Sequence, residues 1–227
     1  ALGRSSIGLQ SRTLSGLVML IATPALVFHT LVSLHVGQEA VTTMSLAALL
    51  CIGISAAIAL TFLKLLNAPI RSFLPALMLP NSGNMGLPLV VLTFGPEGMA
   101  LGVAYFFVVA LFQYSVGLSI SSGTLQLRAM ARQPLVYSVA LVLLVSLLEI
   151  PVPKVILKTT EMLGGMMIPT MLILLGSSLA TLKVKDLKPA FAVAAGRLLI
   201  GLVSAVATIF LLGLQGVAAG AVFLLAT

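Results

Sequence analysis

The chain has 227 residues, of which 60% are hydrophobic and 7% are charged, and its mean hydropathy is +1.22. Soluble domains carry about 25% charged residues, so this composition excludes an ordinary soluble enzyme and indicates a protein of the lipid bilayer. The formal net charge of +7 does not indicate a nucleic-acid partner, because the basic residues lie at the ends of apolar segments.

Eight apolar segments follow one another along the chain, separated by short polar or Pro- and Gly-containing turns. Most come close to the roughly 20 residues that a helix needs to cross a bilayer. The segments cover residues 13–34, 41–66, 69–94, 98–122, 134–148, 155–181, 187–213 and 216–227. No linker is long enough for a separate soluble domain, so the pattern predicts an all-α, polytopic membrane protein.

The basic residues divide unequally between the two sides of the membrane that these segments imply. One side receives Arg4, Arg12, Lys64, Arg71, Arg128, Arg132, Lys183, Lys185 and Lys188. The other side receives only Lys154 and Lys158. Because cytoplasmic loops carry an excess of Lys and Arg, the first side is predicted to be cytoplasmic.

Two segments share the position of a proline. Pro24 in residues 17–28 and Pro169 in residues 164–174 are each flanked by apolar residues, about 145 positions apart. The second lies five spans after the first, an odd number, so it is inverted in the membrane, as in many secondary transporters. The repeat predicts ten spans in the natural protein, of which this chain holds the second to the first half of the ninth, truncated at both ends.

The third segment is interrupted by a polar, helix-breaking sequence, Leu-Pro-Asn-Ser-Gly-Asn-Met-Gly-Leu-Pro-Leu, at residues 79–89. Pro80 disfavours a helical conformation at the residue before it. Gly83 and Gly86 permit backbone conformations that are closed to other residues. The sequence therefore predicts a broken helix.

The two half-helices predicted on either side are of similar length. Residues 71–79 and 87–94 would extend about 12–13 Å each at 1.5 Å per residue, which places the break near mid-membrane. We expect Asn84 or Ser82 to cap the second half-helix, and Pro88 suits its first turn.

A break at this depth predicts a binding site. Irregular backbone inside a membrane is tolerated where it is buried in protein or lines a watery cavity. The free N–H groups of a half-helix favour anions, and Asn81 adds amide donors, so a carboxylate is the expected ligand. The alternative is a Pro/Gly kink in a packed bundle, but the density of Pro, Asn and Gly favours a binding site.

Arg197 lies about ten residues, roughly 15 Å, into its span, and no carboxylate in the apolar segments lies at a similar depth to pair with it. An ionisable residue at that depth is a functional candidate. It either braces the structure, by bonding carbonyls or reaching the cytoplasm, or contacts an anionic substrate; bracing is favoured.

Three other polar residues lie inside apolar segments. His29 is a candidate for carrying a coupling proton, but a hydrogen-bonded packing role is favoured for it. Gln113 and Tyr114 lie mid-span in the segment after the break, where they either line the cavity or pair with a neighbouring helix.

The sequence contains no HExxH, GxSxG or P-loop motif and no cluster of Cys and His. We therefore expect no enzymatic activity, no metal site and no cofactor. The shortage of acidic residues inside the spans also argues against sodium or proton coupling through a carboxylate.

The sequence at residues 79–89 resembles the broken-helix motif of the auxin efflux carrier family, which includes plant PIN proteins and bacterial permeases for malate, malonate and similar acids. Three other stretches also resemble this family. They are Pro24-Ala-Leu-Val-Phe-His29, Ile168-Pro169 with Leu175-Gly-Ser177, and Ala195-Gly-Arg-Leu198. The short loop at 123–133 favours the bacterial type over plant carriers with a long regulated loop.

The resemblance implies a ten-helix fold of inverted five-helix repeats, like that of bile acid symporters and sodium–proton antiporters, commonly as a homodimer. Two broken helices would cross at the substrate site, with Pro80 as the crossover proline and Asn81 as the substrate-facing amide. Residues 13–34 and 134–181 would form a scaffold. Residues 41–122 and 187–227 would form a core that moves against it as an elevator.

Together these features predict a secondary transporter of a small organic anion in a bacterial inner membrane or a plasma membrane. The expected substrate-binding residues are Pro80, Asn81, Ser82, Gly83, Asn84, Gly86, Gln113 and Tyr114, with Arg197 and His29 in coupling or bracing roles. The alternatives are a sodium-coupled symporter of the bile acid type and a membrane sensor with a transporter-like fold.

Overall fold

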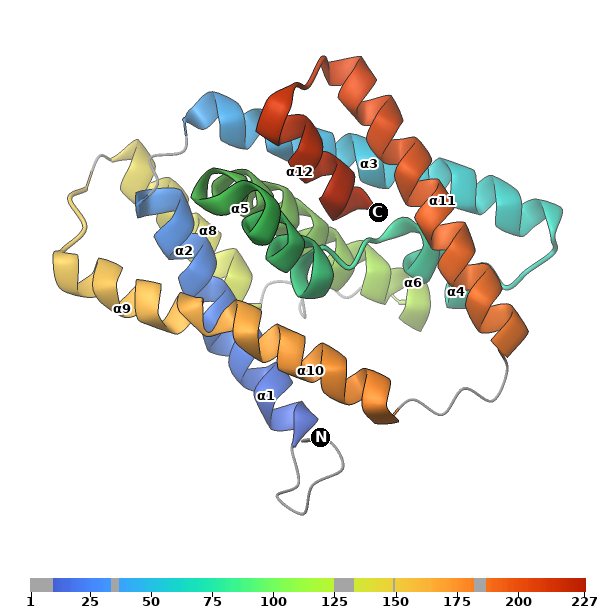
Figure 1. Ribbon diagram of the computed structural model, residues 1–227, viewed down its shortest axis with the longest axis horizontal. Coiled ribbons are helices and arrows are strands. Elements are labelled where there is room, and N and C mark those ends of the chain that lie inside the picture. Colours follow the sequence, from blue (N-terminus) through green and yellow to red (C-terminus); the bar gives the residue numbers. More distant parts are fainter. Residues whose placement is uncertain (1–9, 34–36, 125–132, 149, 182–186) are drawn as a thin grey trace. The chain divides into compact units, whose positions relative to one another are not determined.

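The computed structural model describes residues 10–33, 37–124, 133–148, 150–181 and 187–227, and all regular secondary structure in these ranges is helical (Figure 1). Five of its helices are long and apolar enough to cross a membrane. Two shorter apolar helices accompany them, and the longest stretch, Ile70–Ser122, holds two predicted segments. Helices therefore occupy all eight predicted apolar segments, which confirms a polytopic helical protein.

The chain divides into two compact units. Unit 1 combines Ala1–His35 with Arg132–Lys185, and unit 2 combines Val36–Ala131 with Asp186–Thr227. Several basic residues used to predict the orientation lie outside the described residues, namely Arg4, Arg128, Arg132, Lys183 and Lys185.

Unit 1 contains two apolar helices that are each distorted just before a proline. The first runs through α1 (Ser11–Leu17), a π turn η2 (Val18–Ala22) and α2 (Thr23–Ser33). Pro24 cannot donate a hydrogen bond to the preceding turn and its ring crowds the carbonyl there, so the helix widens at η2. The second runs through α9 (Lys154–Gly165) and α10 (Met167–Thr181), with the break just before Pro169.

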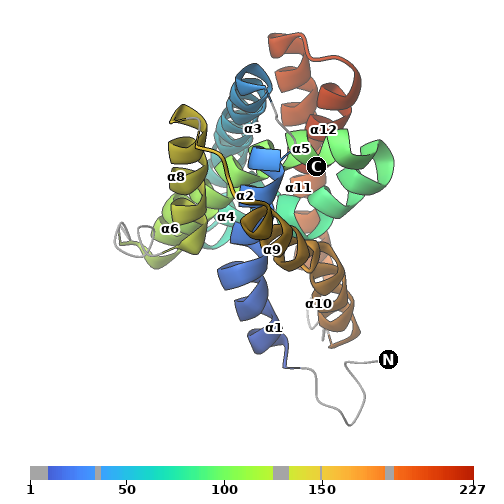
Figure 2. The same cartoon turned by 90° about the vertical axis from the view of Figure 1, so that its left-hand side faces the viewer.

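The helices of unit 1 pack around α2. Both α9 and α8 (Pro134–Leu147) contact α2, and α10 contacts α1 (Figure 2). α9 and α2 come very close at Gly164, where a Cβ built on the glycine would lie 2.7 Å from the Cα of Leu26. Only glycine lets the two backbones come this close.

Unit 2 is built on α3 (Gln38–Leu65) and α11 (Leu187–Leu212), which pack against each other. Buried polar side chains link them: the Ser55 hydroxyl donates to Ser204 Oγ at 3.0 Å, and the Cys51 thiol donates to Thr208 Oγ1 at 3.2 Å. Hydrogen bonds between small polar residues are a common way of joining helices in membranes.

The first part of the broken helix is α4 (Ile70–Met78), and the part after the break continues into a helical hairpin. α5 (Leu87–Phe112) contains Gly95 at φ 62° and ψ −149°, a conformation that no helix accommodates. The two arms lie side by side, because a Cβ built on Gly102 would lie 3.1 Å from Leu87. The chain therefore reverses at Gly95.

α3 and α11 end in the same kind of turn. Asn67 follows α3 at φ 50° and Gly213 follows α11 at φ 61°. The amide of Ala68 donates to the carbonyl of Leu63 at 2.9 Å, and the equivalent bond after α11 is 3.0 Å long. In both places a left-handed residue closes the helix and starts the next one. The helix that follows α11 is α12 (Gly216–Ala226).

Candidate functional site

The predicted break is present between α4 and the next helix. Leu79 leaves the helical conformation at φ −101° and ψ 122°, as expected of a residue before proline. Pro80 and Asn81 follow it, and the helix resumes as a π turn, η3 (Ser82–Gly86), that runs directly into α5. Residues 79–81 are therefore the non-helical part of this membrane segment.

The break is shorter than the sequence predicted, and its glycines act differently. We expected the second half-helix to begin at residue 87 and the glycines to adopt unusual backbone conformations. The helix instead begins at Ser82, and neither Gly83 nor Gly86 has a positive φ. Each glycine makes room for a neighbour, because a built Cβ at Gly83 would lie 2.8 Å from the ring of Phe106.

The capping prediction was also wrong. The N-cap residue is Asn81, rather than Asn84 or Ser82, and its side chain makes no capping hydrogen bond. Its carbonyl oxygen accepts bonds from the amides of Met85 and Gly86, both at 3.2 Å. The amides before Met85 in this turn have no carbonyl acceptor within the helix. The N-terminus of η3 therefore carries a partial positive charge.

A pocket of about 380 Å³ lies beside the break, within unit 2. Its walls come from the end of α4, from the break, and from η4 (Gln113–Gly117) with α6 (Leu118–Ser122). The lining residues are Pro75, Ala76, Leu79, Pro80, Asn81, Gln113, Gly117, Leu118 and Ser121. Asn81, in the break, and Gln113, in η4, are both exposed, and their side chains carry the amide groups of the lining.

The far wall of the pocket is a second irregular stretch of helix. η4 is a π turn, and the hydroxyl of its Ser115 donates to the carbonyl of Leu111 at the end of α5. Gly117 lets this wall approach the break, because a built Cβ would lie 2.8 Å from Leu79. Since π turns often mark functional positions, two of them beside one pocket strengthen the assignment of a site.

The structure brings together only part of the predicted site. Pro80, Asn81 and Gln113 line the pocket. The remaining predicted residues do not line it; they are Ser82, Gly83, Asn84, Gly86 and Tyr114, all in η3 or η4. Sequence reasoning missed Pro75 and Ser121, although Pro75, as a proline inside a short helix, was a usable signal.

Arg197 lies in the same unit and contacts the main chain of α12. Its Nη2 donates to the carbonyl oxygen of Ala226 at 2.7 Å. The neighbouring Leu225 packs on the broken helix, because a Cβ built on Gly86 would lie 2.8 Å from its Cδ2. The arginine therefore bonds the backbone one residue from the point where α12 meets η3.

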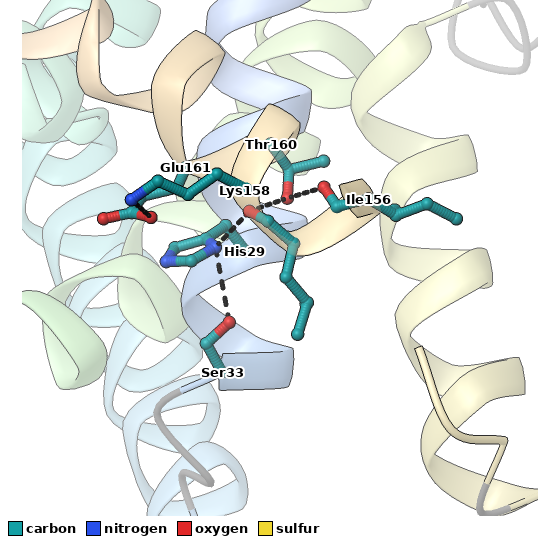
Figure 3. Close-up of polar contacts among 7 residues, drawn as sticks. His29, Ser33, Ile156, Lys158, Thr160 and Glu161 are labelled. Carbon is teal, nitrogen blue, oxygen red and sulfur yellow. Dashed lines mark hydrogen bonds and ion pairs between the residues drawn. The ribbon is translucent and has the colours of Figure 1, made fainter. Parts of the chain in front are cut away.

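His29 belongs to unit 1 and joins two of its helices. Its Nδ1 lies 3.1 Å from the carbonyl oxygen of Leu157 and 3.3 Å from the Ser33 hydroxyl (Figure 3). A carbonyl oxygen only accepts, so Nδ1 carries the proton. The nearby ion pair of Lys158 and Glu161, at 2.9 Å, lies within α9. These contacts agree with a packing histidine.

The fold and the site define a class: a multi-pass helical membrane protein with an interrupted helix that lines a pocket, a feature that recurs in membrane transporters. The model of the membrane transport protein family matches residues 9–126 and 120–227. The chain therefore belongs to this family, that of the auxin efflux carriers, and is a membrane transporter. Comparison with curated proteins and with solved structures gave no match.

Proposed function

We propose that this transporter carries a small organic anion, bound through a carboxylate at the break between α4 and η3. The observation that carries the proposal is the pocket lined by Asn81, the residue at the N-cap of η3, which brings a side-chain amide to the start of that helix. Unpaired N–H groups at the start of a helix attract negative charge, and the effect is largest where water is scarce.

The lining of the pocket supports an anion over a cation. None of its nine residues is acidic, and Asn81 and Gln113 supply side-chain amides that can donate to a carboxylate. Pro75, Leu79 and Leu118 supply apolar surface for the rest of the molecule. This combination suits a compact carboxylate with a partly apolar body.

We further propose that unit 2 is the mobile core and unit 1 the scaffold, and that they alternate access to the site as an elevator. Unit 2 contains the whole broken helix and the whole pocket. Because all residues of the site belong to one compact unit, the site can move with that unit while its residues keep their positions relative to one another.

An inverted repeat within unit 2 is part of the same proposal. Asn67 and Gly213, which end α3 and α11, lie 146 positions apart, and so do Pro69 and Gln215, which precede α4 and α12. The contacts match as well, because α3 contacts α4 and α12, and α11 contacts the same two helices. This supports α12 as the counterpart of α4.

Uptake by proteoliposomes that contain the purified protein tests the proposal. Malate, malonate and indole-3-acetate are suitable radiolabelled substrates, with and without ion gradients. Asn81→Ala should lower uptake, and Asn81→Asp should abolish it because the new carboxylate repels the anion. Thr93→Ala is the control, since the exposed Thr93 hydroxyl bonds the carbonyl of Leu89 in its own helix. Unchanged uptake by Asn81→Asp would contradict the proposal.

A further inference from the structure

Arg71 is an exposed cation near the start of α4, on the face of that helix that lines the pocket. The lining residues Pro75 and Leu79 follow it by four and eight positions, which is the spacing of residues on one face of a helix. Arg71 makes no hydrogen bond and no ion pair with another described residue. Its positive charge is therefore available to a ligand.

The guanidinium of Arg71 reaches from α4 to α6, the two helices that form the walls of the pocket at this end. A Cβ built on Gly123 would lie 3.0 Å from Arg71 Nη1 and 3.1 Å from its Cζ. Gly123 ends α6 and comes two residues after the lining residue Ser121, and both are exposed. The charge therefore lies beside an exposed end of the pocket, which Pro75 and Ser121 form. We call it the outer end.

The end of α6 explains why the guanidinium lies there. Gly123 has φ 72°, and its amide donates to the carbonyl of Ser119 at 2.9 Å, so the helix stops at this point. The last carbonyls of a helix carry a partial negative charge, equivalent to about half an elementary charge, which attracts a cation. This attraction holds the guanidinium in place but does not neutralise it. A net positive charge remains at the outer end of the pocket.

The length of α4 decides what this charge can do. Asn81 follows Arg71 by ten residues, so an anion held at the break lies roughly 15 Å along the helix from Arg71. No hydrogen bond extends over that distance, whereas Coulombic attraction does when the salt concentration is low and the surroundings are apolar. Arg71 therefore acts on the anion during its entry and not after it has bound.

We propose that Arg71 attracts the transported anion into the outer end of the pocket, on the side predicted to be cytoplasmic, and so raises the rate of its capture. This inference rests on the proposed function and assigns a residue that favours ligands of higher negative charge, because Coulombic attraction grows in proportion to that charge. Arg71 is a positioning residue for entry, whereas Asn81 holds the carboxylate at the break.

Initial rates of uptake by proteoliposomes, measured against substrate concentration, test this proposal because they separate KM from the maximal rate. Arg71→Gln should raise KM about threefold for indole-3-acetate, which carries one negative charge, and about ninefold for malonate, which carries two at neutral pH. The maximal rate should not change. Both increases should largely disappear when the salt concentration rises from about 10 mM to about 1 M, because the Debye length falls from about 30 Å to about 3 Å.

Two further variants separate the charge from other properties of Arg71. Arg71→Lys should keep the KM of the wild type, because attraction at a distance depends on the charge and not on the forked geometry of the guanidinium. Lys64→Gln is the matched control. It removes another exposed cation of unit 2, at the end of α3, a helix that contributes nothing to the lining, and it should leave both KM values unchanged.

Three outcomes would contradict the proposal. Equal KM values for wild type and Arg71→Gln at low salt, with Asn81→Asp inactive, would overturn this inference alone. A lower melting temperature in Arg71→Gln, with a KM change that depends on neither salt nor ligand charge, would show that the arginine only caps α6. Wild-type protein that takes up none of the tested acids would overturn the proposed function, and this inference with it.

Arg71→Cys keeps the proposal testable if Arg71→Gln does not fold, because its charge can be set after purification. Cys51 is buried, so a methanethiosulfonate reagent should modify position 71 alone. A reagent that attaches a cation should restore the KM of the wild type, and one that attaches an anion should raise KM above that of the unmodified variant. Equal KM values after the two reagents would overturn the proposal.

Discussion

Gly86 of the broken helix and Leu225 of α12 are in direct contact. A Cβ built on Gly86 would lie 2.8 Å from Cδ2 of Leu225 and 3.4 Å from its Cα, and Leu225 itself is 1% exposed. The contact joins η3, which follows the break, to α12, whose Ala226 carbonyl accepts a hydrogen bond from Arg197. The size of residue 86 therefore sets how closely these elements approach.

Gly86→Ala should destabilise the protein by about 1–3 kcal/mol, because overpacking a closed contact forces neighbours apart. It should also lower uptake, since the shift occurs in η3, the turn that follows the break. The free energy of unfolding, measured by denaturant titration in mixed micelles, checks the first expectation. Gly53→Ala in α3 is the matched control, because nothing lies within 4 Å of a Cβ there. If both variants are equally stable, the contact is not as close as described.

Gly164→Ala should destabilise unit 1, whereas Gly165→Ala should not. A Cβ on Gly164 would meet the backbone of Leu26 at 2.7 Å, and backbone atoms cannot rotate away as side chains do. A Cβ on Gly165 meets nothing within 4 Å. We expect a loss of about 2 kcal/mol or more for the first variant and no loss for the second. Equal melting temperatures for the two variants would refute the close crossing of α2 and α9.

His29→Ala should lower stability by about 1 kcal/mol, the usual contribution of a hydrogen bond between membrane helices, because the bond from Nδ1 to Leu157 is lost. His29→Gln keeps an N–H donor and should recover part of that loss. Since the histidine packs within unit 1, the pH dependence of uptake should be the same in His29→Ala as in the wild type. A changed pH profile would instead assign His29 to proton coupling.

The reversal at Gly95 predicts which side of the membrane each end of the hairpin faces. Lys64, at the end of α3, is predicted to be cytoplasmic together with Arg71, and Glu97, which follows one membrane crossing after Arg71, is therefore expected to be external. Cysteines placed at the exposed positions 64 and 97 should react with an impermeant maleimide from opposite sides of intact cells. The buried Cys51 should not react from either side. Labelling of both positions from the same side would contradict the orientation.

The sequence predicted the positions of the helices because apolar length and proline placement act locally. Residues 79–81 leave the helix as the proline requires, and Asn81 lies in the pocket. The roles of Gly83 and Gly86 could not be predicted, because Phe106 and Leu225, which fill the space above them, lie far away in sequence. The same applies to Ser121, which reaches the pocket only because α6 packs against α4.

The glycines of unit 2 impose two different limits on evolution and engineering. Gly95 has a backbone conformation that strains every L-amino acid, so even a tiny side chain is unfavourable there, although the surroundings are empty. Gly83 has helical geometry and is limited by volume, so a smaller aliphatic side chain in place of Phe106 would make room for a side chain at position 83. A larger residue at position 83 can therefore be accommodated by a second substitution at position 106. At position 95 no second substitution can relieve the backbone strain, because the strain does not come from a neighbouring residue.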